Sequence, residues 1–146
     1  MSYEVNWEAH GVMVRIFGNS RGRDLINAYN AVNKDERFDD ARYEIVDCSD
    51  ITESSISIED MRQIAHLDRA AARSVPNLRL AIVSPHENTQ ALAHFYKSEA
   101  DDISWDIGIF SDLDTTRKWC DPDYIIRDKD DYIDQFNSDQ TITSLR

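Results

Sequence analysis

The most continuous apolar run in the chain is Leu78 to Val83, and only Arg79 interrupts it. A strand with apolar residues on both faces belongs inside a parallel sheet that helices cover on both sides. Ser84 and Pro85 end the run, because this pair favours a turn. The run therefore predicts a central strand with Ile82 buried in the core, and with it an α/β fold.

Near the N-terminus, apolar and polar residues alternate with a period of two, the pattern of half-buried strands. A turn at His10-Gly11 separates two such segments, so we expect an N-terminal hairpin. Two later segments, Tyr43 to Cys48 and Ile103 to Phe110, predict further strands, and Ser49 to Ser55 predicts a loop. The residues expected to face inward are Tyr3, Val5, Trp7, Ala9, Val12, Val14 and Ile16 in the hairpin and Trp105, Ile107 and Ile109 in the last strand.

Four other segments place apolar residues on one helical face. Ser20 is the expected cap of the first, Ser57 with Asp60 resembles a capping box before the second, and Ser111 with Asp114 begins the last. In chain order, the expected apolar faces are Leu25, Ala28, Tyr29 and Val32; Ile58, Met61, Ile64, Ala65, Ala72 and Val75; Ala91, Leu92, Phe95 and Tyr96; and Leu113, Thr116 and Trp119.

The resulting order, ββαβαβαβα, predicts a mixed five-stranded sheet with helices packed on it. The first strand should lie antiparallel to its neighbour at one edge of the sheet. A chain of 146 residues fits one domain. We expect this domain to span residues 1–120 and an acidic extension to follow over 121–146.

The formal net charge is -12, from 16 Lys and Arg against 28 Asp and Glu. Such a surface repels phosphate backbones and anionic lipids, which argues against nucleic acid and membranes as partners. The nearest thing to a basic patch is the group Arg15, Arg21 and Arg23, and we interpret it as solvated surface charge.

Neither the cysteines nor the histidines indicate a metal centre. Cys48 and Cys120 lie far apart without a CxxC spacing, and the histidines lack a spacing such as HxxxH. We interpret the cysteines as reduced thiols of a cytoplasmic protein. No signal peptide or membrane-spanning run is recognisable, which favours the same location. Without a glycine-rich phosphate loop, the sequence predicts no cofactor.

Three segments together resemble a known family. They are Gly11 to Gly18, an opening strand set between glycines; Leu78 to Pro85 with the following helix; and Ile109 to Trp119. In the last segment Phe110 and Trp119 match the family pattern, whereas Thr116 replaces the usual Ala. This order and spacing resemble the SpoIIAA-like branch of the STAS superfamily, the anti-sigma-factor antagonist fold, which is also related to Sec14-like domains. The resemblance implies a bacterial-type regulator that binds a protein partner.

The resemblance also implies a phosphorylatable serine at the start of the helix after the third strand, in an Asp-Ser-Ser-Gly-like context. Ser54 and Ser55 fall near this position, although Glu53 precedes them and Ile56 replaces the Gly. Ser57 is the third candidate. The alternative interpretation is that Ser57 caps the helix and the other two are loop residues. The many nearby carboxylates would repel a phosphate here, whereas the helix dipole would attract it.

A second candidate site lies where the parallel strands end, since ligands tend to bind at that edge of such sheets. Asp47, Ser49, Ser84 and His86 should gather there, with Glu87 beside them. Serine, histidine and aspartate are the components of a hydrolase triad, but no GxSxG elbow is present. We therefore name no catalytic residue and keep a hydrolase only as the less favoured alternative.

Two functional hypotheses remain. The first is a non-enzymatic interaction module that uses the edge around Ser54 to Ser57. The second is a carrier of a small apolar ligand, with a pocket lined by Phe95, Tyr96, Trp105 and Trp119. These aromatic residues have core packing as a simpler interpretation. The sequence is compatible with a homodimer.

The acidic extension contains more apolar residues than a purely solvating tail needs. Ile125, Tyr132 and Phe136 share a helical face, and Ile133 lies beside it. We therefore predict a helix near Lys129 to Asn137 that docks on the domain or on a second subunit, with 138–146 loosely ordered. A disordered acidic tail is the alternative, because Asp is a poor helix former.

Overall fold

The computed structural model describes residues 3–122. Within this range the elements follow the predicted order ββαβαβαβα, with one additional 3-10 turn before the third strand. The strands are β1 (Tyr3–Trp7), β2 (Gly11–Arg21), β3 (Tyr43–Ser55), β4 (Arg79–Val83) and β5 (Asp106–Phe110). The helices are α1 (Gly22–Asn33), α2 (Ile58–Ala71), α3 (Glu87–Glu99) and α4 (Leu113–Cys120), and the 3-10 turn is Glu36–Asp40.

The strands form one five-stranded sheet in the order β1-β2-β3-β4-β5. As predicted, β1 is antiparallel to β2 and lies at one edge, whereas the remaining neighbours are parallel. β3 is the middle strand, and β4 lies between it and the edge strand β5. One row across the parallel strands joins Val12, Glu44, Leu80 and Ile107. This row brings a carboxylate into the centre of the sheet.

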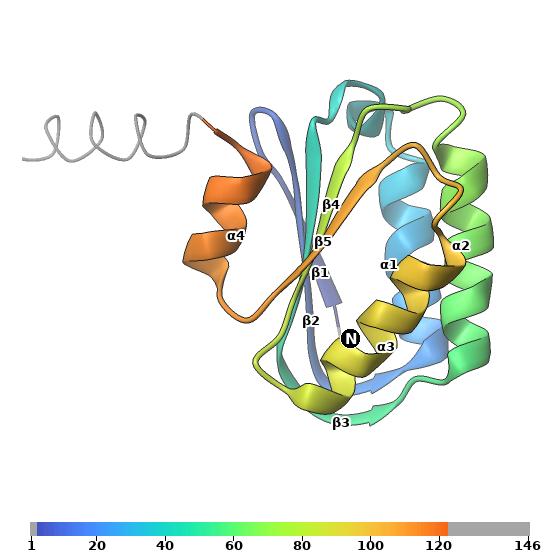
Figure 1. Cartoon of the computed structure of the whole chain (residues 1–146), viewed down its shortest axis with the longest axis vertical. Coiled ribbons are helices and arrows are strands. Elements are labelled where there is room, and N and C mark those ends of the chain that lie inside the picture. Colours follow the sequence, from blue (N-terminus) through green and yellow to red (C-terminus); the bar gives the residue numbers. More distant parts are fainter. Residues whose placement is uncertain (1–2, 123–146) are drawn as a thin grey trace, which may run out of the picture.

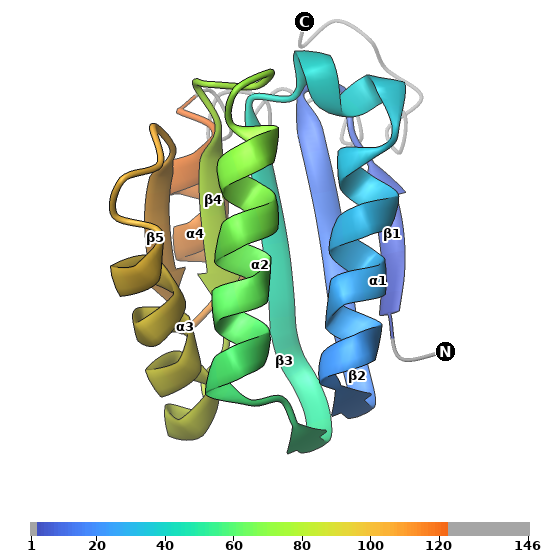
Figure 2. The same ribbon diagram turned by 90° about the vertical axis from the view of Figure 1, so that its right-hand side faces the viewer.

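The two faces of the sheet are covered unequally (Figure 1). α1, α2 and α3 lie side by side across one face, as Figure 2 shows, and α4 packs on the other. The large core lies under the three helices, and a smaller core under α4 contains Tyr43, Ile45, Ala81, Val83 and Cys120. Side chains of β4 alternate between these cores, so Ile82 is buried, at 8% exposed, in the larger one. The prediction for this strand is confirmed.

The main error in the expected elements concerns the ends of β2 and β3. We expected a loop from Ser49 to Ser55, but β3 continues to Ser55 and pairs there with an extended β2. Two register shifts permit the pairing, and Gly18 adopts the positive φ of 70° at the second of them. Ser20 is therefore not a helix cap. It is fully buried in β2 and donates a hydrogen bond to the carbonyl of Phe17 over 3.4 Å.

Several residues that the sequence predicts to face inward are exposed in the structure, and one predicted helix cap is a different residue. Ile58 and Leu113, the first residues of α2 and α4, are 49% and 38% exposed. Ala91 and Ala9 are exposed too: α3 buries Ala93 and Tyr96 instead, and β1 ends before Ala9. Asp112, not Ser111, caps α4, because its carboxylate accepts from the N–H of Thr115 over 2.8 Å.

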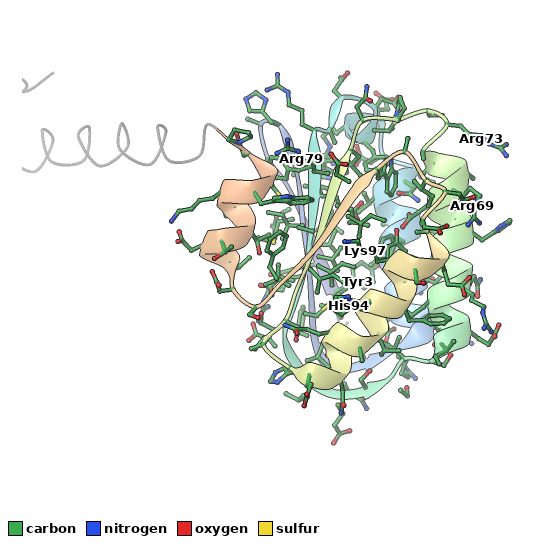
Figure 3. The ribbon with its side chains drawn as sticks, in the orientation of Figure 1. Tyr3, Arg69, Arg73, Arg79, His94 and Lys97 are labelled. Atoms are coloured by element: carbon green, nitrogen blue, oxygen red, sulfur yellow. The ribbon has the colours of Figure 1, made fainter. Side chains whose placement is uncertain are left out.

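Ion pairs and hydrogen bonds of two arginines attach α4 to the sheet. Arg117 of α4 forms a bidentate ion pair with Glu8, the residue after β1. The Tyr43 hydroxyl also donates a hydrogen bond to Glu8. Arg79, which points to the α4 side of the sheet in Figure 3, donates to the carbonyl of Trp119 over 2.6 Å. These contacts join α4 to β1, β3 and β4.

The predicted C-terminal helix near 129–137 lies outside the described residues, as does most of the predicted extension over 121–146. Among the helices within residues 3–122, none has the length and apolar character needed to cross a bilayer.

Candidate functional site

An open groove of about 510 Å³ lies where β3 ends and where α2 and α3 begin. Its half-buried floor is apolar and its rim is polar, which is the usual composition of a binding surface. The groove lies at the carboxyl ends of the parallel strands, the edge that the sequence predicted for a site. Its lining residues are Ile51, Thr52, Glu53, Ser54, Ile56, His86, Asn88, Thr89 and Leu92.

A narrow apolar pocket continues from this groove into the core. It also reaches the buried residues Tyr29 and Tyr96. The residues it shares with the groove are Ile51, Ser54, Ile56, Thr89 and Leu92. Its volume of about 50 Å³ is well below the roughly 150 Å³ of an apolar cavity that holds benzene. The pocket as it stands is therefore too small for a ligand of the size of benzene.

The three candidate serines are all exposed beside the groove. Ser57 caps α2 as predicted: its hydroxyl oxygen accepts from the N–H of Asp60 over 3.2 Å, and the Asp60 carboxylate accepts from the N–H of Ser57 over 2.8 Å. Ser54 accepts from the N–H of Ile56 over 3.3 Å. Ser54 and Ser55 end a strand instead of lying in a loop, so the sheet fixes their positions.

The start of α1 meets the same region. A Cβ atom at Gly22 would lie 2.1 Å from the Asp60 carboxylate, so a larger residue would have to displace the side chain that caps α2. Gly22 is thus a residue of the site region that sequence analysis missed. Its signal was the position of an isolated glycine directly at a helix start.

The predicted cluster Asp47, Ser49, Ser84 and His86 does come together. The His86 ring lies 3.3 Å from the carbonyl oxygen of Ser49, and its backbone N–H donates to the Ser84 hydroxyl over 3.0 Å. Asp47 accepts from the N–H of Ser49 over 3.0 Å. The ring therefore faces a backbone carbonyl and the carboxylate faces a backbone amide, whereas a hydrolase triad requires the ring to join the two side chains.

The four predicted aromatic residues do not line one pocket. Tyr96 alone lines the apolar pocket, whereas Phe95 is half-buried beneath the guanidinium of Arg62. Trp105 is buried and donates from its ring N–H to the carbonyl of Val75 over 2.6 Å. Trp119 lies on the α4 face against Phe110, with ring centroids 5.2 Å apart. Trp105 and Trp119 also line a separate open cavity of about 480 Å³ beside β5, so the four residues are divided between two pockets and a packing contact.

Sequence analysis missed a group of buried polar residues below the apolar pocket. Glu44 of β3 and Asp68 of α2 are both 0% exposed, and the Tyr96 hydroxyl donates to Asp68 over 2.6 Å. Burial raises the pKa of Asp68 to about 7, and burial together with the charge of Asp68 raises the pKa of Glu44 well above its usual range. Tyr29 of α1 lies close enough for both carboxylates to raise its pKa further.

Within residues 3–122, no group of three or more His, Cys, Asp or Glu side chains is arranged to hold a metal ion. Glu44 and Asp68 alone therefore supply too few ligands for a hard cation such as Ca²⁺, which takes six to eight oxygen ligands.

The arrangement of these elements is also found in a protein of known structure. The sequence matches no protein-family model and no curated protein. Among solved structures, the anti-sigma factor antagonist SpoIIAA in its unphosphorylated form superposes with a TM-score of 0.55 at 8% sequence identity. The match covers 80% of this chain and 93% of the SpoIIAA chain. The fold is that of SpoIIAA. The predicted STAS-type architecture is therefore confirmed.

Proposed function

We propose that the chain is a non-enzymatic regulatory module that binds a protein partner at the groove beside the start of α2. The observation that supports this proposal is the SpoIIAA-like fold with Ser54 lining the groove and with Ser55 and Ser57 exposed close to it in the chain. The half-buried apolar floor offers Ile51, Ile56 and Leu92 to an inserted side chain. Cytoplasmic location and a domain over residues 1–120 belong to the same proposal.

Phosphorylation of a rim serine would act on this surface through charge. A phosphate on Ser57 would meet the free N–H groups of the first turn of α2, which favours it, and the carboxylates of Glu59 and Asp60, which oppose it. It would also displace the Asp60 contact that caps the helix. We expect modification to change partner affinity and to leave the sheet intact, because the serines lie outside the core.

The experiment is affinity capture from the extract of the host with wild type, Ser55→Ala, Ser55→Glu, Ser57→Ala and Ser57→Glu chains. Ser98→Glu is the matched control, because Ser98 is exposed on α3 away from the groove. We expect at least one Glu form to change the captured partner while Ser98→Glu does not. Capture of the same partners by every form would exclude the serine switch.

Groove binding is tested separately by charge reversal at Glu53, which lines the groove. Glu53→Lys should weaken capture of a partner, whereas Asp39→Lys, at an exposed site on the 3-10 turn, should not. Equal capture by both variants would place the partner on another surface.

The alternative function is binding of a small apolar ligand, and the continuous apolar pocket below the groove favours it. Native mass spectrometry of protein purified from its own host distinguishes the two. A retained small mass that Ile64→Trp abolishes supports the ligand, since Ile64 lines the pocket. A second protein chain supports the regulatory module, and a mass of two copies indicates a homodimer.

A further inference from the structure

Glu44 and Asp68 occupy the interior of the protein without a basic partner among the described residues. Neither side chain is exposed, and both carboxylate oxygens of Glu44 and the Oδ1 atom of Asp68 accept no hydrogen bond from residues 3–122. Ionised carboxylates in an apolar interior are strongly destabilising unless they are paired. Something other than an ion pair must therefore make this arrangement stable.

The groups that face the pair come from every element packed around it. α1 contributes Tyr29 and Asn33, β3 contributes the thiol of Cys48 beside Tyr29, and α3 contributes Tyr96. All of these are neutral hydrogen-bonding groups at neutral pH. Arg69, the next residue of α2, points away from the sheet in Figure 3 and pairs with Asp102 over 2.8 Å. The nearest cation along α2 is thus directed to the surface.

A proton completes the hydrogen bonds of this cluster. Tyr96 already donates to Oδ2 of Asp68, and the neighbouring Asn33 side chain also lowers the pKa of this carboxyl, which suits Asp68 as the acceptor. Protonation of Glu44 removes a buried charge and turns one of its unpartnered oxygens into an O–H donor. The raised pKa values of both carboxyl groups have the same physical cause, since burial opposes the charged forms.

We propose that Glu44 and Asp68 form a buried proton-binding site whose occupancy determines how firmly α2 is held on the sheet. The site joins the middle strand to the later part of α2, whereas the groove lies at the start of the same helix. Loss of the proton leaves two negative charges between α2 and β3 and loosens the helix. The proposal is independent of what binds in the groove.

The sign of the pH dependence follows from the two states. Unfolded Asp and Glu release their protons near pH 4, whereas the folded pair keeps at least one at neutral pH. Unfolding therefore releases a proton between these pH values, and the folded state loses stability as the pH rises. Each retained proton changes the unfolding equilibrium constant by about tenfold per pH unit. The loss ends once the folded pair itself has ionised.

The test is urea unfolding of the full chain from pH 6 to pH 9 with wild type, Glu44→Gln and Asp39→Asn. Gln has the size of Glu and stays neutral, and Asp39 is an exposed control. We expect the wild type and Asp39→Asn to lose stability as the pH rises through this range, by at most about tenfold in the folding constant per pH unit for each proton released. Glu44→Gln should show a shallower loss over this range, because only the Asp68 proton, with a pKa of about 7, is left to release.

Two further measurements keep the proposal open to refutation if Glu44→Gln is itself destabilised. Infrared difference spectra of the folded wild type at pH 7 should show the C=O band of a buried protonated carboxyl, and Glu44→Gln should weaken it, because only Asp68, with a pKa of about 7, can then carry a proton. Hydrogen exchange should show faster opening of α2 amides in the wild type above pH 8, after correction for intrinsic rates. Absence of the infrared band, or identical pH slopes in wild type and Glu44→Gln, overturns the proposal.

Discussion

Each face of the sheet has a glutamate that contacts a helix, but the two differ in exposure and in their partners. On the α4 side, Glu8 accepts two hydrogen bonds from Arg117 and another from Tyr43, and its side chain is 26% exposed. On the three-helix side, Glu44 is fully buried and has no basic partner among residues 3–122. Both side chains hold a helix on the sheet, but one does so as a charge and the other as a neutral acid.

Solvent access explains the difference. Water at the rim lowers the cost of the Glu8–Arg117 pair, so an ion pair is stable there. In the centre of the sheet the cost of burying two charges exceeds their attraction, and a proton replaces the cation. Burial depth therefore decides whether pH or salt affects each contact: salt weakens the rim pair, and pH governs the buried pair.

The largest expected effect is on the two thiols, one under each face. Cys48 and Cys120 are buried, and burial raises the pKa of each thiol to about 12. At pH 8 the thiolate fraction is then roughly a thousandfold below that of an unperturbed cysteine. We expect labelling by a thiol reagent to be slowed by about this factor in the folded chain.

Cys120 should react faster than Cys48, since α4 is the shorter helix over the smaller core. Equal rates, measured by mass spectrometry, would show that the two faces open together.

The next effect is the loss of core packing at Ile82 on the three-helix face. Ile82→Ala should cost about 2–5 kcal/mol in the free energy of unfolding, because the surrounding helices cannot collapse into the space. Chemical denaturation measures the loss, and Val83→Ala reports on the α4 face from the adjacent position. A loss below about 1 kcal/mol for Ile82→Ala would contradict its place in the larger core.

A smaller loss is expected when Arg117 is removed. Arg117→Met should cost about 1–2 kcal/mol, since the pair with Glu8 is partly exposed and the Tyr43 contact remains. The double variant with Glu8→Gln should lose less than the sum of the two single variants, because they share one interaction. Additive losses at low salt would mean that the ion pair does not hold α4.

These faces also show what sequence patterns can and cannot predict. Element order and the buried β4 follow from apolar periodicity, which the sequence displays directly. The end of β3 could not be found in this way, because Asp50 and Glu53 are polar and their strand pairing depends on distant residues of β2. Of the candidate site, the Ser57 cap follows from local chemistry, whereas the grouping of aromatic residues depends on which face each strand presents.

Glu44 and Asp68 had a weak signal in the sequence. Glu44 lies inside the apolar segment Tyr43 to Cys48, and Asp68 follows Met61, Ile64 and Ala65 at helical spacing. Both were passed over because Asp and Glu are rarely buried without a partner. A carboxylate on a predicted apolar face is thus informative, because it indicates either a partner or a retained proton.

The smallest expected effect concerns the acidic extension, which follows α4. If its predicted helix docks with Ile125, Tyr132, Ile133 and Phe136, the α4 face is the nearest place to gain cover, since Met13, Phe110 and Trp119 are only partly buried there. Truncation after Pro122 keeps the C-terminal residue of α4 and removes the extension. Docking worth about 1 kcal/mol would then appear as a fall in melting temperature of roughly 2–8 °C.

Sedimentation of the same two proteins distinguishes docking on the domain from docking on a second copy, because only the latter changes the mass. An unchanged melt together with an unchanged mass would mean that the extension remains solvated and that the α4 face is complete with one helix.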